Sequence, residues 1–99
     1  MYFVNGLLPI HPGEFLKENL EELGISQAEF ARTVGVSAMR ISHIINGTRP
    51  ITAEIALILS QAFRQSPQYW LNLQSDYDLK IAHRITKVKL ETIPQLTPA

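Results

Sequence analysis

The sequence predicts an all-α domain of five helices followed by an extended C-terminal tail. Apolar residues recur at helical spacing in five separate stretches, and each stretch follows a residue that is suited to the start of a helix. Glycines close the first three stretches, as they commonly close helices. The chain has 99 residues, of which 45% are hydrophobic, and at this size one compact core is the default.

The first two helices have signals at their ends. The first is predicted at about 12–23, because Pro12 suits the first position of a helix and Gly24 is a stop signal. The second is predicted at about 27–34, because Ser26 is a good N-cap and a glutamate stands three residues later, as in a capping box.

The next two helices are each introduced by a hydroxyl side chain. The third is predicted at about 38–46, where Ser37 is the N-cap and an Asn-Gly pair closes the helix. The fourth is predicted at about 53–64, with Thr52 as its N-cap. Both stretches are apolar on one side, so we expect each helix to pack that side into the core.

The fifth helix and the tail differ in pattern. Ser66 and Pro67 open a helix that is predicted at about 67–84. After Ile85 the residues alternate between polar and apolar over 87–91, a pattern that suits a short strand. The tail then contains two prolines, so we expect it to be extended and exposed.

The third predicted helix has two unlike faces when its residues are placed at about 100° each around the axis. Its isoleucines lie together and would fix it to the core. The other side carries hydrogen-bond donors, an apolar tip and a positive charge, from Met39, Arg40, Ser42, His43 and Asn46. Gly35 permits the sharp turn between this helix and the short one before it. The pair therefore predicts a helix-turn-helix, whose second member would be the recognition helix.

Charge is distributed unevenly along the chain, although nine basic and nine acidic residues cancel. Between Glu29 and Glu54 there is no acidic residue, while three arginines occur there, Arg32, Arg40 and Arg49. Glutamates instead concentrate on the first predicted helix. A phosphate backbone would therefore meet positive charge and no carboxylate over the helix-turn-helix.

Several classes of protein are disfavoured. The chain has no cysteine, which excludes disulfides and thiolate chemistry, and no catalytic motif or metal-binding histidine spacing. Its apolar runs are far shorter than a membrane span requires, and no signal-like leader precedes them. We therefore expect a soluble, cytoplasmic protein that is not an enzyme, has no cofactor or metal, and does not associate with a membrane.

Three separated motifs resemble one family. Residues 26–37 followed by 41–47 are similar to the helix-turn-helix of Xre/Cro-type phage repressors. Residues 11–16 (His-Pro-Gly-Glu-Phe-Leu) and 66–78, which begins Ser-Pro-Gln-Tyr-Trp, resemble the HigA/VapI branch of bacterial antitoxins. The motifs agree in order and spacing, which makes the resemblance more specific than the helix-turn-helix alone.

The resemblance implies a domain organisation, a function and partners. It covers roughly residues 10–84, as a lambda-repressor-like helix-turn-helix domain, between an N-terminal arm (1–9) and a C-terminal tail (85–99). The implied function is that of an antitoxin in a type II, HigBA-like module. Such a protein binds double-stranded operator DNA as a homodimer, represses its own operon and neutralises a HigB-like toxin, which is a RelE-like mRNA endonuclease.

The resemblance also implies which residues face DNA. By position in the motif they are Gln27, Ser37, Ala38, Met39, Arg40, Ser42, His43, Thr48 and Arg49. Gln27 matches a position that commonly holds a phosphate at the start of a helix. Many relatives carry a basic residue directly after the Asn-Gly turn. Here Thr48 takes that place and Arg49 follows, which leaves these two residues as alternatives for the backbone contact.

Other interpretations of these residues stay open. Met39 fits packing against a neighbour, since methionine fills gaps, while Arg40 and Arg49 fit an ordinary solvated surface. Trp70 and Tyr77 share a helical stripe, which favours a core or dimer interface over a platform for stacking bases. A stand-alone regulator without a toxin and an interaction module without DNA binding are the alternative functions.

Overall fold

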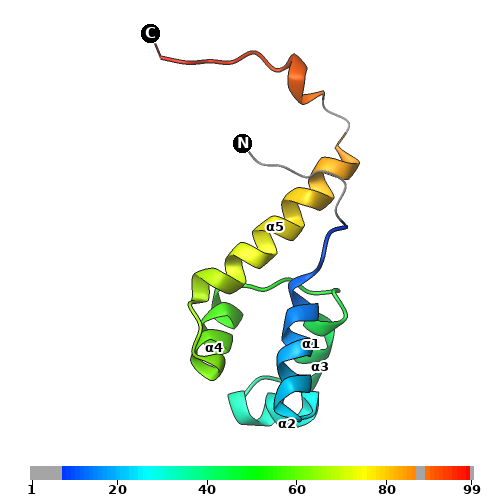
Figure 1. The fold of residues 1–99 in the computed structure, drawn as a ribbon, viewed down its shortest axis with the longest axis vertical. Coiled ribbons are helices and arrows are strands. Elements are labelled where there is room, and N and C mark those ends of the chain that lie inside the picture. Colours follow the sequence, from blue (N-terminus) through cyan, green and yellow to red (C-terminus); the bar gives the residue numbers. More distant parts are fainter. Residues whose placement is uncertain (1–7, 87–88, 99) are drawn as a thin grey trace.

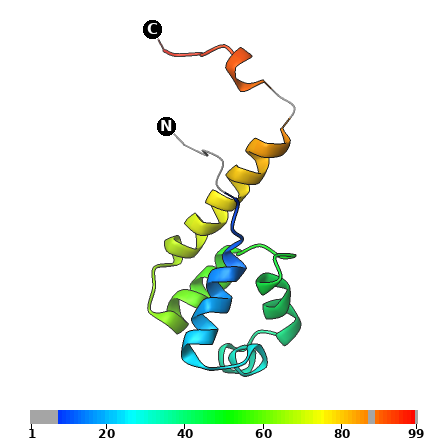
Figure 2. The same cartoon turned by 45° about the vertical axis from the view of Figure 1, so that its right-hand side comes forward.

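The computed structural model describes residues 8–86 and 89–98. Its helices are α1 (Pro12–Leu23), α2 (Gln27–Val34), α3 (Ala38–Ile45), α4 (Ala53–Phe63), α5 (Pro67–Ile85) and a short 3-10 helix, η1 (Leu90–Thr92). The prediction of an all-α fold with five α-helices is confirmed. Helices α1 to α4 lie together, and α5 packs on α1 and α4 with its first half and then extends beyond them (Figures 1 and 2).

Side-chain caps begin the helices where the sequence predicts them. The hydroxyl oxygens of Ser26, Ser37 and Thr52 accept hydrogen bonds from backbone N–H groups three residues later, at 3.0, 3.1 and 3.2 Å. Ser66 accepts from the N–H of Gln68 at 3.1 Å. These bonds satisfy donors that have no partner within the helix, so the caps fix where each helix starts.

The helix ends differ from the prediction by one residue in three places. Helix α4 stops one residue early because Arg64 adopts a left-handed conformation with φ of 56°. Helix α3 also stops one residue early, because Asn46 is its C-cap and Gly47 turns the chain with φ of 82°. Helix α5 continues one residue further, to Ile85.

The prediction of a strand over 87–91 is wrong for residues 89–91, which the structure describes. Residues 87 and 88 lie outside the described residues, and Lys89 leads directly into η1. The N–H groups of Thr92 and Ile93 bond to carbonyls three residues back, at 2.9 and 3.1 Å. An alternating pattern forms a strand only when a second strand pairs with it, and residues 8–86 and 89–98 contain no strand.

One core joins the five helices. Its buried apolar side chains are Leu16, Leu20, Phe30, Ala31, Ile41, Ile44, Ile45, Ile51, Ile55, Ala56, Leu59 and Trp70. Trp70 is completely buried, so it is a core residue and cannot stack on bases. Phe63 lies 6.2 Å from Trp70 and stacks on Phe30 at 5.3 Å between ring centroids, which ties α4 and α5 to α2.

Helices α1 and α3 approach closely at Gly13. A Cβ atom at this position would overlap the backbone carbonyl of Ile44, so only glycine fits between the two helices. The contact holds the second turn of α3 against the start of α1.

As for membranes, none of the helices in the described ranges is long and apolar enough to span one.

Candidate nucleic-acid interface

Helix α3 is anchored on one side and open on the other. Ile41 and Ile44 are completely buried and Ile45 is 8% exposed, whereas Met39 is 67% exposed. The two-faced helix predicted from the sequence is therefore confirmed. Met39 therefore does not belong to the core.

The turn between α2 and α3 fixes the angle between these two helices. Gly35 has φ of 74°, and its N–H and that of Val36 both donate to the carbonyl of Ala31, at 2.9 and 3.0 Å. No atom lies within 4 Å of a Cβ built at Gly35, so the requirement for glycine here is conformational rather than steric. Ser37 then caps α3, and Ala38 and Met39 in its first turn are exposed.

The residues predicted to face DNA fall into two groups. Six of them are exposed, namely Gln27, Ser37, Ala38, Met39, Thr48 and Arg49. The other three, Arg40, Ser42 and His43, are half-buried. Gln27 lines a hollow with Lys17, Glu21 and Ile45, at the end of α3 opposite to Ala38.

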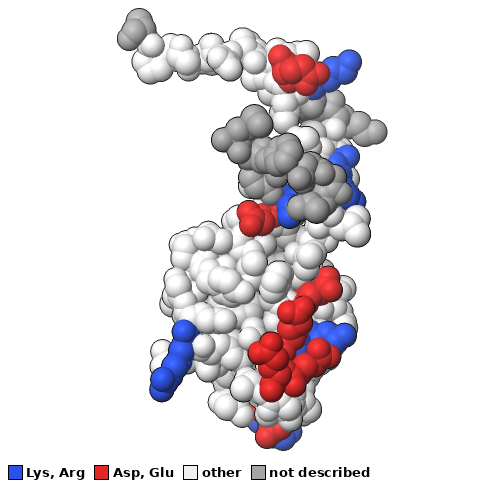
Figure 3. All heavy atoms as spheres, in the orientation of Figure 1, with Lys and Arg blue, Asp and Glu red and all other residues white. Residues whose placement is uncertain are grey.

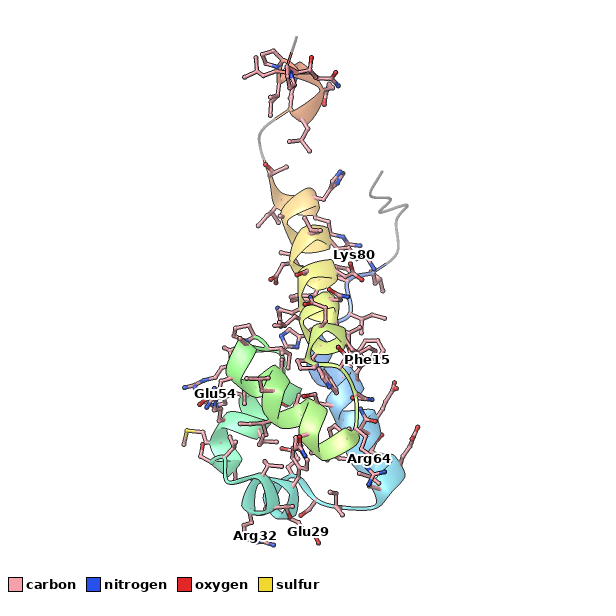
Figure 4. The ribbon with its side chains drawn as sticks, turned by 90° about the vertical axis from the view of Figure 1, so that its left-hand side faces the viewer. Phe15, Glu29, Arg32, Glu54, Arg64 and Lys80 are labelled. Carbon is pink, nitrogen blue, oxygen red and sulfur yellow. The ribbon has the colours of Figure 1, made fainter. Side chains whose placement is uncertain are left out.

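Arg40 forms an ion pair that the sequence analysis did not anticipate. Its NH2 group donates to Oε1 of Glu54 at 2.9 Å, and the two side chains are 29% and 69% exposed. Glu54 lies in the first turn of α4, next to α3 (Figure 4). The expectation that this surface carries no carboxylate is wrong, because the fold brings Glu54 against Arg40 although the two residues are fourteen positions apart in the sequence.

The loop after α3 is tied to the last turn of that helix. The carbonyl of His43 accepts from the Thr48 hydroxyl at 3.1 Å, and from the N–H groups of Thr48 and Arg49 at 2.9 and 3.2 Å. The Thr48 hydroxyl proton is therefore already used, whereas the Arg49 side chain is exposed. This geometry favours Arg49 over Thr48 as the residue that reaches a phosphate.

Gln74 of α5 is hydrogen-bonded to the same loop. It is 8% exposed, its Oε1 accepts from the N–H of Ile51 at 2.7 Å, and its Nε2 donates to Oδ1 of Asp78 at 2.9 Å. The bond to Ile51 joins α5 to the segment that carries Arg49. No pattern in the sequence singles out Gln74, because its partner is 23 residues away.

His11 is a second buried polar group, and it lies next to the same loop. Its Nδ1 accepts from the N–H of Gly13 at 2.9 Å, and its ring contacts that of Tyr77 edge to face at 4.9 Å. Burial lowers the pKa of His11, although the charges of Asp78 and Glu14 and a hydrogen bond to the Arg49 backbone oppose the shift. The motif at 11–16 therefore has a structural role, as the cap of α1 and a support for the loop.

The outward side of α3 offers hydrogen-bond donors and an apolar tip. Among the described residues no group of three histidine, cysteine or acidic side chains could hold a metal ion. The first turn of α3 instead combines Met39, Arg40 and the Ser37 cap on an outward surface. Arginine donors and an exposed methyl group are suited to reading base edges.

Comparison with known proteins agrees with this geometry. The helix-turn-helix family profile HTH_3 matches residues 16–70. An addiction module antidote protein of the HigA family from Coxiella burnetii is 40% identical, and its structure covers 94% of this chain and 100% of its own with a TM-score of 0.83. The chain belongs to the HigA-type helix-turn-helix family.

Other relatives are similarly close. Pseudomonas aeruginosa antitoxin HigA, solved with the higBA promoter, is 41% identical, with a TM-score of 0.84 over 90% of this chain and 100% of that one. Virulence-associated protein I of Dichelobacter nodosus is 43% identical over 81 residues, which are 81% of this chain and 75% of the relative.

A further relative is longer than the matched region. Virulence-associated protein A′ of Dichelobacter nodosus is 47% identical over 72 residues, and the chain spans 63% of its length. Membership of the HigA-type family confirms the HigA/VapI resemblance and the Xre/Cro-like fold. It also confirms the prediction of a non-enzymatic class.

Proposed function

We propose that this HigA-type chain is the antitoxin of a type II toxin-antitoxin module. In this proposal it binds operator DNA as a homodimer, represses its own operon and neutralises a RelE-like mRNA-cleaving toxin in the cytoplasm. One observation carries the DNA-binding part: the first turn of α3 faces outward with Met39 67% exposed, while its isoleucine face is buried. The HigA relative solved with its promoter supports the same conclusion.

The proposed DNA contacts divide into two kinds. Met39, Arg40 and His43 lie on the outward side of α3, where side chains can reach base edges in the major groove. The remaining candidates are suited to phosphates or to supporting contacts, and they are Gln27, Ser37, Ala38, Ser42, Thr48 and Arg49. We infer that base contacts from α3 specify the operator, whereas phosphate contacts fix the orientation of the protein.

The proposed homodimer would use the projecting part of α5. Leu79 and Ile85 are 50% and 69% exposed there, and Leu90 of the tail lines a small hollow with Leu79 and Ala82. Figure 2 shows that this part of α5 stands clear of the other helices. One small module buries only about 600–1,000 Å² on DNA, so pairing two copies on two half-sites would increase the affinity.

The proposed toxin surface is the acidic side of α1. Four exposed glutamates gather there, as Figure 3 shows in the view of Figure 1, and they are Glu14, Glu18, Glu21 and Glu22. A nuclease that grips RNA is expected to be basic, so an acidic surface would steer the two proteins together. The N-terminal arm, residues 1–9, is the alternative docking element, and residues 1–7 of it lie outside the described residues.

Two experiments test this function. In the first, the unmodified protein is incubated with a pool of duplexes of random sequence, and we expect it to enrich an inverted repeat with half-sites about one helical turn apart. In the second, the neighbouring open reading frame is expressed with and without the chain. A basic, growth-arresting product that the chain neutralises is expected, whereas its absence would favour the alternative, a stand-alone Xre-family regulator.

A further inference from the structure

Glu54 has a fixed position beside the candidate interface. It is the second residue of α4, whose start is set by the Thr52 cap, with a bond of 3.2 Å from the N–H of Ile55. Ile55 is 1% exposed and anchors this turn in the core. A carboxylate in the first turn of a helix is also favoured by the helix dipole. The charge of Glu54 therefore stays next to α3.

Arg40 keeps free donors while it is paired with Glu54. Its guanidinium carries five N–H donors in a rigid planar fork, and the bond to Glu54 uses one of its two terminal NH₂ groups. The backbone N–H of Arg40 is capped by Ser37 at 3.1 Å, which fixes the root of the side chain. The backbone bond and the ion pair together restrict the positions of the guanidinium before any DNA arrives.

We propose that Glu54 is a specificity-determining residue that acts through Arg40. This inference rests on the proposed DNA-binding function. Held by Glu54, the guanidinium can still donate to a base edge, such as the two acceptors of guanine in the major groove. A phosphate that approaches the same guanidinium meets the Glu54 carboxylate and is repelled. Glu54 thereby discourages the sequence-independent contact more than the base contact.

The proposal predicts a change in discrimination rather than in folding. The probes are the duplex that the unmodified protein enriches from a random pool and a shuffled duplex of the same composition. For Glu54→Gln we expect affinity for the shuffled duplex to rise by about twofold to fivefold, the range that one exposed ion pair spans. Affinity for the enriched duplex should rise less, so the ratio of the two affinities falls.

Salt dependence gives a second readout, which a purely structural role would not change. If Arg40 released from Glu54 takes up a phosphate, the slope of log affinity against log salt on the shuffled duplex should steepen by about 0.9. Thermal unfolding of Glu54→Gln should change little, because Glu54 is 69% exposed and the helix dipole and one exposed ion pair each contribute little to stability at such a position.

A matched control is Glu29→Gln. Glu29 lies in the first turn of α2 as Glu54 lies in the first turn of α4, and both are labelled in Figure 4. Glutamine serves equally well in a capping box, so this change removes the same charge without disturbing the helix start. We expect Glu29→Gln to shift both affinities by the same factor and to leave their ratio unchanged.

The pairing itself is tested in an Arg40→Ala background. There Glu54→Gln should no longer alter the ratio of affinities, because the proposed effect passes through Arg40. An unchanged ratio for Glu54→Gln in the otherwise unmodified protein would overturn the proposal, as would an equal effect in the presence and absence of Arg40. Failure of the unmodified protein to enrich any sequence would instead overturn the proposed function together with this inference.

Discussion

Arg64 and Gly35 both adopt left-handed backbone conformations at helix ends, with φ of 56° and 74°. This conformation costs a residue with a Cβ atom about 1 kcal/mol, and glycine is largely free of that cost. We therefore expect Arg64→Gly to raise the free energy of unfolding by up to about 1 kcal/mol and Gly35→Ala to lower it by a similar amount. Urea denaturation measures both changes. A loss of stability in Arg64→Gly would mean that the contacts of the Arg64 side chain stabilise the fold by more than its left-handed backbone destabilises it.

His11 should make stability depend on pH. Burial lowers its pKa in the folded state below the ordinary value of 6.5, so the unfolded chain binds a proton more readily. Neutral His11 therefore contributes to the free energy of unfolding above pH 6.5, and this contribution is lost as the pH falls through the lower pKa of the folded state. Protonation would also remove the Nδ1 acceptor that caps Gly13.

The measurement compares the free energy of unfolding at about pH 7.5 and about pH 5.5. We expect a larger decrease in the unmodified protein than in His11→Asn, since asparagine can cap the helix but does not titrate in this range. His83→Asn is the matched control, because His83 is exposed. Equal pH dependence in all three proteins would show that His11 does not contribute.

The residues that could be predicted from the sequence act over short distances. Ser26, Ser37 and Thr52 cap helices as expected, because each bonds to an N–H three residues away. Gln74 and Glu54 could not be predicted, because their partners lie 23 and 14 residues away and meet only in the folded chain. The candidate interface could thus be proposed from the sequence, whereas the groups that bond to it could not be predicted.

Among the elements, the contact between α1 and α3 depends most on a single residue. In Gly13→Ala, the new Cβ would overlap the backbone carbonyl of Ile44. Neither helix backbone can shift locally to relieve this overlap, so the two helices would have to move apart as units. We expect a loss of about 3 kcal/mol in the free energy of unfolding. The exposed Lys17 on the same helix supplies the control, since Lys17→Ala should change stability by less than about 0.5 kcal/mol. A stable Gly13→Ala protein would show that the two helices separate readily.

The acidic side of α1 carries the prediction for the toxin. Reversing two charges, with Glu18→Lys and Glu22→Lys together, should slow association with a basic toxin and reduce its dependence on salt. Stopped-flow association measured at two salt concentrations checks this, and operator binding by gel shift serves as the control for folding. If the association rate is unaltered in a folded protein, the toxin docks on another surface.

Helix boundaries could be predicted because caps and glycines are local signals, while the exceptions have local causes too. Arg64 ends α4 although an arginine gives no stop signal, and the alternation after Ile85 has no second strand to pair with among residues 8–86 and 89–98. Periodicity indicates which side of an element is apolar. It does not indicate whether a partner for that element exists.

At the scale of the whole molecule, a zero net charge conceals two oppositely charged regions. The acidic side of α1 and the arginine-bearing segment from Arg32 to Arg49 belong to different faces in the proposed function, one for a protein and one for DNA. The projecting part of α5 would supply the third surface, between two copies. In the proposed function, this arrangement would allow one small domain to hold DNA, a toxin and a second copy at separate sites.

In the proposed function, the outward side of α3 reads a specific DNA sequence. This claim is tested by fluorescence anisotropy with the enriched and shuffled duplexes, for the unmodified protein and for Arg40→Ala. We expect Arg40→Ala to weaken binding to the enriched duplex by about 1–3 kcal/mol, to affect the shuffled duplex less, and to unfold at the same temperature as the unmodified protein. Equal weakening on the two duplexes would assign Arg40 to a phosphate, and equal affinity of the unmodified protein for both duplexes would contradict the claim.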